Sequence, residues 1–108
     1  MTTITMFFND KQQYTGFEVN DHAAFSYAGK DIVCAGISIL VINTINSIES
    51  FTDDFISYDV DEKTGYIRFS LDGEGSAESK VLLQAMVLGL SELEKQYKKY
   101  LKLKFEEV

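Results

Sequence analysis

Residues 32–49 read IVCAGISILVINTINSIE, and this stretch decides the fold. Its first half is rich in Ile and Val, which would also suit a strand, but its length favours a helix. Asp31 stands directly before it and is a good N-cap. Because apolar residues surround the first half almost completely, we expect burial on several sides. Helical spacing is kept by Cys34, Ile37, Val41, Ile45 and Ile48.

Strand patterns stand on both sides of this helix. The first segment alternates Ile4, Met6 and Phe8 with other residues, and a turn over 9–12 then leads into a second strand, which predicts an opening hairpin. Residues 61–65 indicate the loop of another hairpin. The last strand alternates Leu with Lys, which is typical of a protected edge. The expected strands are 3–8, 14–19, 55–60, 66–71 and 101–105.

A second helix is expected over about 77–97, with Ser76 as its cap. Its predicted apolar stripe consists of Leu82, Ala85, Met86, Gly89, Leu93 and Tyr97. The resulting order, β-β-α-β-β-α-β, predicts an α+β fold with two helices packed on a mainly antiparallel sheet. Residues 1–108 are expected to form one domain, with a long loop over 20–31.

Composition narrows the function classes. The chain has 108 residues, 45% of them apolar, and a net charge of −7. This charge argues against a general nucleic-acid binder, so no direct nucleic-acid binding is expected, and it favours basic partners. The longest apolar run, 32–42, has 11 residues, whereas a bilayer needs about 20, so no membrane span is expected. The N-terminus shows no signal peptide, and one cysteine fits a reducing compartment, so we expect a cytoplasmic protein. One Cys and one His cannot supply a usual zinc site, so no metal or cofactor is expected.

The two residues that can carry nucleophilic chemistry are the only histidine, His22, and the only cysteine, Cys34. Cys34 stands three residues past the proposed cap, where unpaired N–H groups and the helix dipole stabilise a thiolate. A nearby imidazole could accept the thiol proton, and the same N–H groups could hold an oxyanion. This arrangement would suit a thiol hydrolase that uses a catalytic Cys/His pair.

Structural roles are open for each of these residues. A cysteine among Ile and Val often only packs, and a lone loop histidine is usually solvated, so spacing alone leaves both interpretations open. Asp31 could orient His22 or only cap the helix. Ser38, one turn after Cys34, could support the site or bond back to the helix carbonyl. The lysines from 95 to 104 indicate a solvated face, with a basic docking strip as the alternative.

Two segments together resemble a known family. Asp21-His22-Ala23, followed by residues 29–38 (GKDIVCAGIS), is similar to the bacterial ribosomal-processing cysteine protease family, Prp. The family pattern has Gly-His-Ala, a variable loop, then Gly-x-Asp-Ile/Val-Val-Cys-Ala with a serine soon after. Residues 42–49 (INTINSIE) also resemble family members, so the resemblance covers essentially the whole chain.

The resemblance implies a cysteine endopeptidase that removes the N-terminal extension of ribosomal protein number twenty-seven of the large subunit. It implies that the residue matching the nucleophile is Cys34 and the residue matching the base is His22. It also implies a homodimer and a hydrophobic cleft beside Cys34. The family's glycine before the histidine is Asp21 here, and this carboxylate could shift the pH optimum or the position of the loop.

Two other functions compete with this one. A non-enzymatic acidic module would bind ribosomal or other basic proteins and would keep an unreactive thiol. A redox-sensing thiol would oxidise reversibly at low peroxide and cleave no peptide.

Overall fold

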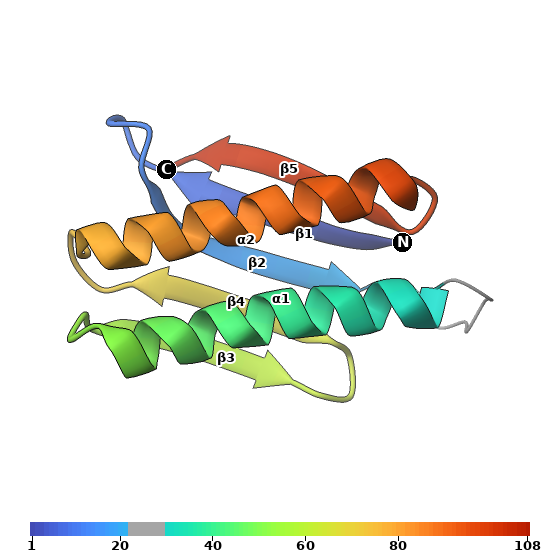
Figure 1. Ribbon diagram of the computed structural model, residues 1–108, viewed down its shortest axis with the longest axis horizontal. Coiled ribbons are helices and arrows are strands. Elements are labelled where there is room, and N and C mark those ends of the chain that lie inside the picture. The colour runs from blue at the N-terminus through green and yellow to red at the C-terminus, as the bar shows by residue number, and fades with distance from the viewer. Residues whose placement is uncertain (22–29) are drawn as a thin grey trace.

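The computed structural model describes residues 1–21 and 30–108, apart from the side chains of residues 21, 30 and 31. In these residues five strands form one sheet, and both helices lie side by side on the same face of it (Figure 1). The order and architecture confirm the predicted α+β fold. Along the chain the elements are β1 (Thr2–Phe8), β2 (Tyr14–Asp21), α1 (Lys30–Phe51), β3 (Ile56–Asp61), β4 (Tyr66–Leu71), α2 (Ala77–Gln96) and β5 (Leu101–Glu107).

The sheet has the order β3-β4-β2-β1-β5 and is mainly antiparallel, as predicted. The pairs β1–β2, β2–β4 and β3–β4 are antiparallel, and the first and last of these are the two predicted hairpins. β5 lies at one edge and runs parallel to β1, with Leu101 opposite Thr2. In the strand order, β4 lies on one side of the central strands β2 and β1, and β5 lies on the other. α2 connects β4 to β5 and therefore crosses the face of the sheet on which both helices lie (Figure 1).

The core lies between the sheet and the helices. Alternate residues of a strand face the same side, so inward-facing positions of paired strands form rows across the sheet. Two such rows cross the three central strands and are buried: Ile4, Val19 and Ile67, and then Met6, Phe17 and Phe69. Within the second row, the rings of Phe17 and Phe69 stack with centroids 5.1 Å apart.

The inner face of α1 follows the predicted helical spacing. Ile37, Val41, Ile45 and Ile48 are buried against the sheet, as expected. The expected burial on several sides is wrong, because Ile32 is 61% exposed and Ile39 is 68% exposed. Within the described part of the chain, the helices are covered by the sheet on one side only, so the outer apolar residues of α1 remain at the surface.

By length and composition alone, residues 32–51 of α1 would suffice to cross a membrane, with a mean hydropathy of 1.7. The 11-residue apolar run is shorter than a membrane span, but the helix continues beyond it. The Asn, Thr and Ser residues that follow the run carry no charge, so the longer segment still meets the criterion for a span. In the structure, however, the inner stripe of this helix packs on a sheet. The core helix of a two-layer protein shows the same length and composition.

The predicted boundary of α1 needs correction. The helix begins at Lys30, two residues before Ile32, and ends at Phe51. Asp31 therefore lies within the first turn, so its predicted N-cap position is wrong, and Cys34 is the fifth helical residue. Helical hydrogen bonding extends over polar residues that show no apolar periodicity, and an acidic residue suits the first turn because of the helix dipole.

Ser76 caps α2, as predicted, but the buried face of this helix differs from the predicted apolar stripe. The Ser76 hydroxyl caps the helix and accepts a hydrogen bond from the Ser79 N–H at 3.2 Å. The buried residues are Ser79, Leu83, Met86 and Leu90, so the predicted stripe is displaced and Ala85 is exposed. The displacement arises because α2 packs against α1 as well as the sheet. A Cβ at Gly89 would approach the Leu40 side chain to 2.9 Å, so this glycine permits the close packing.

Asp54, in the loop between α1 and β3, forms hydrogen bonds with the start of α2. Its carboxylate accepts hydrogen bonds from the Ser79 hydroxyl and from the Ser76 N–H and hydroxyl, the latter two at 2.9 and 2.8 Å. These bonds, that of Ser79 first, hold the pKa of Asp54 below its ordinary value of 3.8. A carboxyl with a lowered pKa stabilises the fold at higher pH, and this contribution is lost as the pH falls below about 4.

An Asp54→Ala variant is expected to lose about 1–2 kcal/mol of unfolding free energy at neutral pH. Urea unfolding of this variant and the wild type measures the loss, and the gap between them should shrink as the pH is lowered from 6 to 3. Asp53→Ala is the control, because Asp53 is exposed and should change stability by less than about 0.5 kcal/mol. A gap that does not depend on pH would contradict the role assigned to the carboxylate.

Candidate active site

Cys34 lies half-buried on α1, at the end of the molecule where the helix begins (Figure 1). It lines a cavity of about 60 Å³ together with Ile37 and Ser38 of the same helix. The rest of the wall comes from the sheet side: Thr2 of β1, Val19 of β2, Gly65 of the β3–β4 turn and Ile67 of β4. The thiol therefore stands in a small and mostly apolar crevice between the two layers.

The sheet register explains why these segments converge. Val19 is paired with Ile67, and Thr2 is paired with Asp21, the last residue of β2. The start of β1 and the ends of β2 and β3 consequently reach the same end of the sheet as the first turn of α1 (Figure 1). Gly65 closes the β3–β4 turn with a φ of 76°, a conformation that suits glycine.

The electrostatic setting of Cys34 comes from the helix start. As the fifth helical residue, Cys34 lies two residues, about half a turn, further into the helix than predicted. Helical side chains lean toward the N-terminus, so the thiol lies over the turn before its own Cα, where the helix dipole favours negative charge. Of the described residues that line the cavity, Thr2, Cys34 and Ser38 are polar and none is a histidine, lysine or carboxylic acid.

The predicted site residues have different outcomes. His22 lies outside the described residues, but it follows Asp21 directly, and Asp21 is paired with the cavity residue Thr2. Ser38 shares the cavity with Cys34, as its one-turn spacing predicts. Its hydroxyl makes no hydrogen bond within the described residues, so the suggested back-bond to the helix is not found there. Thr44, in contrast, bonds back to the Leu40 carbonyl at 2.7 Å.

Two contributors to the cavity are missing from the sequence interpretation. Thr2 reads only as part of a strand, and Gly65 only as part of a hairpin loop. Both come to Cys34 through strand pairing over long sequence distances, which no local pattern encodes. The one available signal is the glycine at the end of the 61–65 loop, which marks a tight turn without indicating what lies beside it.

A cysteine near the start of a helix is an arrangement that thiol hydrolases use, and comparisons with known proteins identify the family of this chain. The family model described as cysteine protease Prp matches residues 1–102. The ribosomal processing cysteine protease Prp of Bacillus subtilis (strain 168) is 33% identical over 86 residues, which cover 76% of this chain and 77% of that protein. The protein of the same name from Staphylococcus aureus (strain Mu50 / ATCC 700699) is 26% identical over 106 residues, covering 98% and 100%.

Solved structures agree with the sequence comparisons. The crystal structure of the ribosomal processing protease Prp from S. aureus in complex with a substrate peptide matches with a TM-score of 0.92 and 25% identity. It covers 98% of this chain and 100% of that one. The chain therefore belongs to the cysteine protease Prp family, as the resemblance suggested. It is accordingly a cysteine protease, which confirms the prediction of an enzyme.

Proposed function

We propose that this protease removes the N-terminal extension of ribosomal protein number twenty-seven of the large subunit, with Cys34 as nucleophile and His22 as base. The observation that carries the proposal is the end of β2. Asp21 is paired with Thr2, which lines the same cavity as Cys34, and His22 is the next residue. β2 therefore ends one residue before His22, at the end of the sheet where the thiol lies.

The reaction follows from these two side chains. The His22 imidazole takes the proton from the Cys34 thiol, and the thiolate attacks the scissile carbonyl carbon. N–H groups of the first turn of α1 hold the oxyanion that forms. As the C–N bond breaks, the imidazolium returns its proton to the leaving amine, and a thioester remains. His22 then takes a proton from water, hydroxide attacks the thioester, and the acid product leaves as the Cys34 thiol is restored.

The net charge of the whole chain favours a basic protein substrate. The net charge of −7 attracts a positively charged protein over a long range, and salt should weaken this attraction. Asp31 and Ser38 are the supporting residues in this proposal, because one lies in the first turn of α1 and the other lines the cavity. The relatives from B. subtilis and S. aureus are named as ribosomal processing proteases, which favours the same substrate class.

The proposal extends to assembly and location. A homodimer would cover outer apolar residues of the helices, such as Ile39 and Leu88, which are 68% and 67% exposed. A single cysteine suits the reducing cytoplasm. Light scattering on the eluting protein measures the mass directly, and a monomer mass at micromolar concentration would contradict the dimer.

The proposed substrate is tested by incubating the protein with a peptide that spans the processing site of the host's own ribosomal protein. Mass spectrometry should show one cut by the wild type. A His22→Ala variant is expected to cut about 10²- to 10⁴-fold more slowly, because the general base is lost. Asp21→Gly is the matched control, since it changes the neighbouring residue to the one in the family pattern and should preserve cleavage.

Two outcomes would contradict the proposal. If the folded wild type leaves the peptide intact and Cys34 also alkylates slowly at neutral pH, the acidic binding module becomes the better account. If His22→Ala cuts as fast as the wild type, the base is another residue.

A further inference from the structure

The positive charges of this acidic protein are gathered at one end. Half of its ten basic residues lie within residues 95–104, a segment that holds no Asp or Glu, whereas the rest of the chain carries a net charge of −12. We call these five residues the basic strip, and they are Lys95, Lys98, Lys99, Lys102 and Lys104. The strip runs from the last turn of α2 around the following turn and onto the edge strand β5.

Most of the basic strip is not neutralised by the protein. Lys95 pairs with Glu92 at 3.2 Å, but within residues 1–21 and 30–108 the other four exposed lysines make no ion pair. Glu94, the nearest acidic residue in the chain, instead accepts a hydrogen bond from the Leu103 N–H at 2.6 Å. Neighbouring like charges repel one another, so a cluster of this kind is stabilised by an anionic partner.

Protection of the sheet edge does not account for the whole strip. Lysines on an edge strand discourage pairing with other chains, which suits Lys102 and Lys104 of β5. Lys98 and Lys99 lie before the strand begins, where no edge needs protection. They extend the positive surface beyond what the edge requires.

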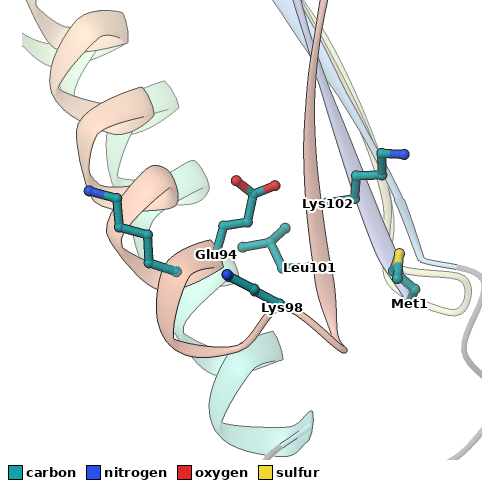
Figure 2. Close-up of a pocket in the computed structure, with 6 residues that line it drawn as sticks. Met1, Glu94, Lys98, Leu101 and Lys102 are labelled. Carbon is teal, nitrogen blue, oxygen red and sulfur yellow. The ribbon is translucent and has the colours of Figure 1, made fainter.

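The strip surrounds two hollows that offer apolar surface beside the charges. Figure 2 shows the first, of about 290 Å³, which is lined by the apolar side chains of Met1 and Leu101, by Lys95, Lys98 and Lys102, and by the carboxylate of Glu94. The second, of about 400 Å³, is lined by Tyr97 and Tyr100 together with Lys98 and Lys99. Both tyrosines are half-buried, so part of each side chain reaches the surface.

We propose that the basic strip binds a single-stranded nucleic acid, with lysines on its phosphates and its bases against the surfaces of the two hollows. A nucleic-acid strand carries one charge per nucleotide, which matches a run of five lysines, four of which make no ion pair within the described residues. Aromatic side chains beside lysines provide stacking surfaces for bases, which an acidic polypeptide would not use. The net charge of −7 argues against general affinity for nucleic acid, so the binding is confined to this end of the molecule.

The strip lies close to the candidate active site. The Thr2 N–H donates a hydrogen bond to the Tyr100 carbonyl at 2.9 Å, and Thr2 also lines the Cys34 cavity. A nucleic acid held on the strip would therefore lie about one strand away from the thiol. Such a position would suit a protein substrate that itself contacts nucleic acid.

Fluorescence anisotropy with a labelled single-stranded RNA of about 15 nucleotides tests the inference on the full chain. The wild type should bind, and raising salt from 50 to 200 mM should weaken binding roughly 20- to 50-fold for three or four phosphate contacts. The double variant Lys98→Gln/Lys102→Gln should bind roughly tenfold more weakly and show a smaller salt dependence. Lys11→Gln/Lys63→Gln is the matched control, because it removes the same charge from two exposed turns elsewhere and should change binding less than about twofold.

Three results would overturn the inference. No binding by the folded wild type at 50 mM salt would mean that the strip is only a solvated face. Equal weakening by both double variants would mean that total charge alone governs binding. Displacement of the RNA by polyglutamate at equal charge concentration would assign the strip to acidic polypeptides. Binding is measured without cleavage, so these outcomes are independent of the proposed protease substrate.

Discussion

A Cys34→Ala variant is expected to lose cleavage of the processing-site peptide by about 10⁴-fold or more. The expectation rests on the loss of the proposed nucleophile. The other polar side chains described in the cavity are the hydroxyls of Thr2 and Ser38, which are much weaker nucleophiles than a thiolate. Initial rates under single-turnover conditions, read by mass spectrometry, measure the loss.

The fold should survive this change. Cys34 is only half-buried and forms no disulfide, since it is the one cysteine of the chain, and alanine suits a helix. We therefore expect the melting temperature to shift by less than about 4 °C, which corresponds to less than about 1 kcal/mol. A variant that still folds but does not cleave assigns the defect to chemistry.

Ser38→Ala is the matched control for the same cavity. It removes one oxygen atom from the side chain one turn after Cys34, and we expect less than a tenfold change in rate if this residue only supports the site. Persistent cleavage by Cys34→Ala, with an intact mass spectrum of the variant, would refute the assignment of the nucleophile. A Ser38→Ala defect as large as that of Cys34→Ala would give Ser38 a direct role.

The largest effect on stability is expected from Phe17→Ala. Phe17 is fully buried at the centre of the sheet, between Met6 of β1 and Phe69 of β4, and its ring stacks on that of Phe69. Removing a buried phenyl ring leaves a cavity and costs about 3–5 kcal/mol. A domain of this size is stable by only about 5–15 kcal/mol, so the variant should unfold at much lower urea concentration.

Phe105→Ala provides the comparison, because it removes the same atoms from a surface position. Phe105 of β5 is 52% exposed and stacks on Tyr14 at a centroid distance of 6.4 Å. We expect a loss below about 1 kcal/mol. Equal losses in the two variants, measured by urea unfolding under the same conditions, would show that the buried row is not the main source of stability.

Local sequence patterns predicted most elements of this fold correctly. The alternation in residues 3–8 and 66–71 identified β1 and β4, and the Ser76 cap located the start of α2 to the residue. These predictions succeeded because side-chain periodicity and capping act over a few residues. The start of α1 was misplaced, since Lys30 and Asp31 carry no apolar signal although their backbone is helical.

Part of the candidate site could be predicted from the sequence. Cys34 stood out as the only cysteine near a helix start, and the spacing to His22 suggested the family, which the comparisons confirmed. The wall of the cavity was not predicted. Thr2 and Gly65 have ordinary local roles, and they lie beside the thiol only because β1 and β4 both pair with β2.

The sequence by itself determined which segments form helices and strands and which family the chain belongs to, and it predicted the two residues of the proposed catalytic pair. Those properties depend on periodicity, capping and the identity of rare residues, which are local. The tertiary structure decided that β5 joins the sheet parallel to β1, that Ile32 and Ile39 stay exposed, and that the backbone of Tyr100 is hydrogen-bonded to Thr2 of the Cys34 cavity. These outcomes depend on pairing between residues far apart in the chain, whose free energy is gained only when the whole sheet and its helices assemble.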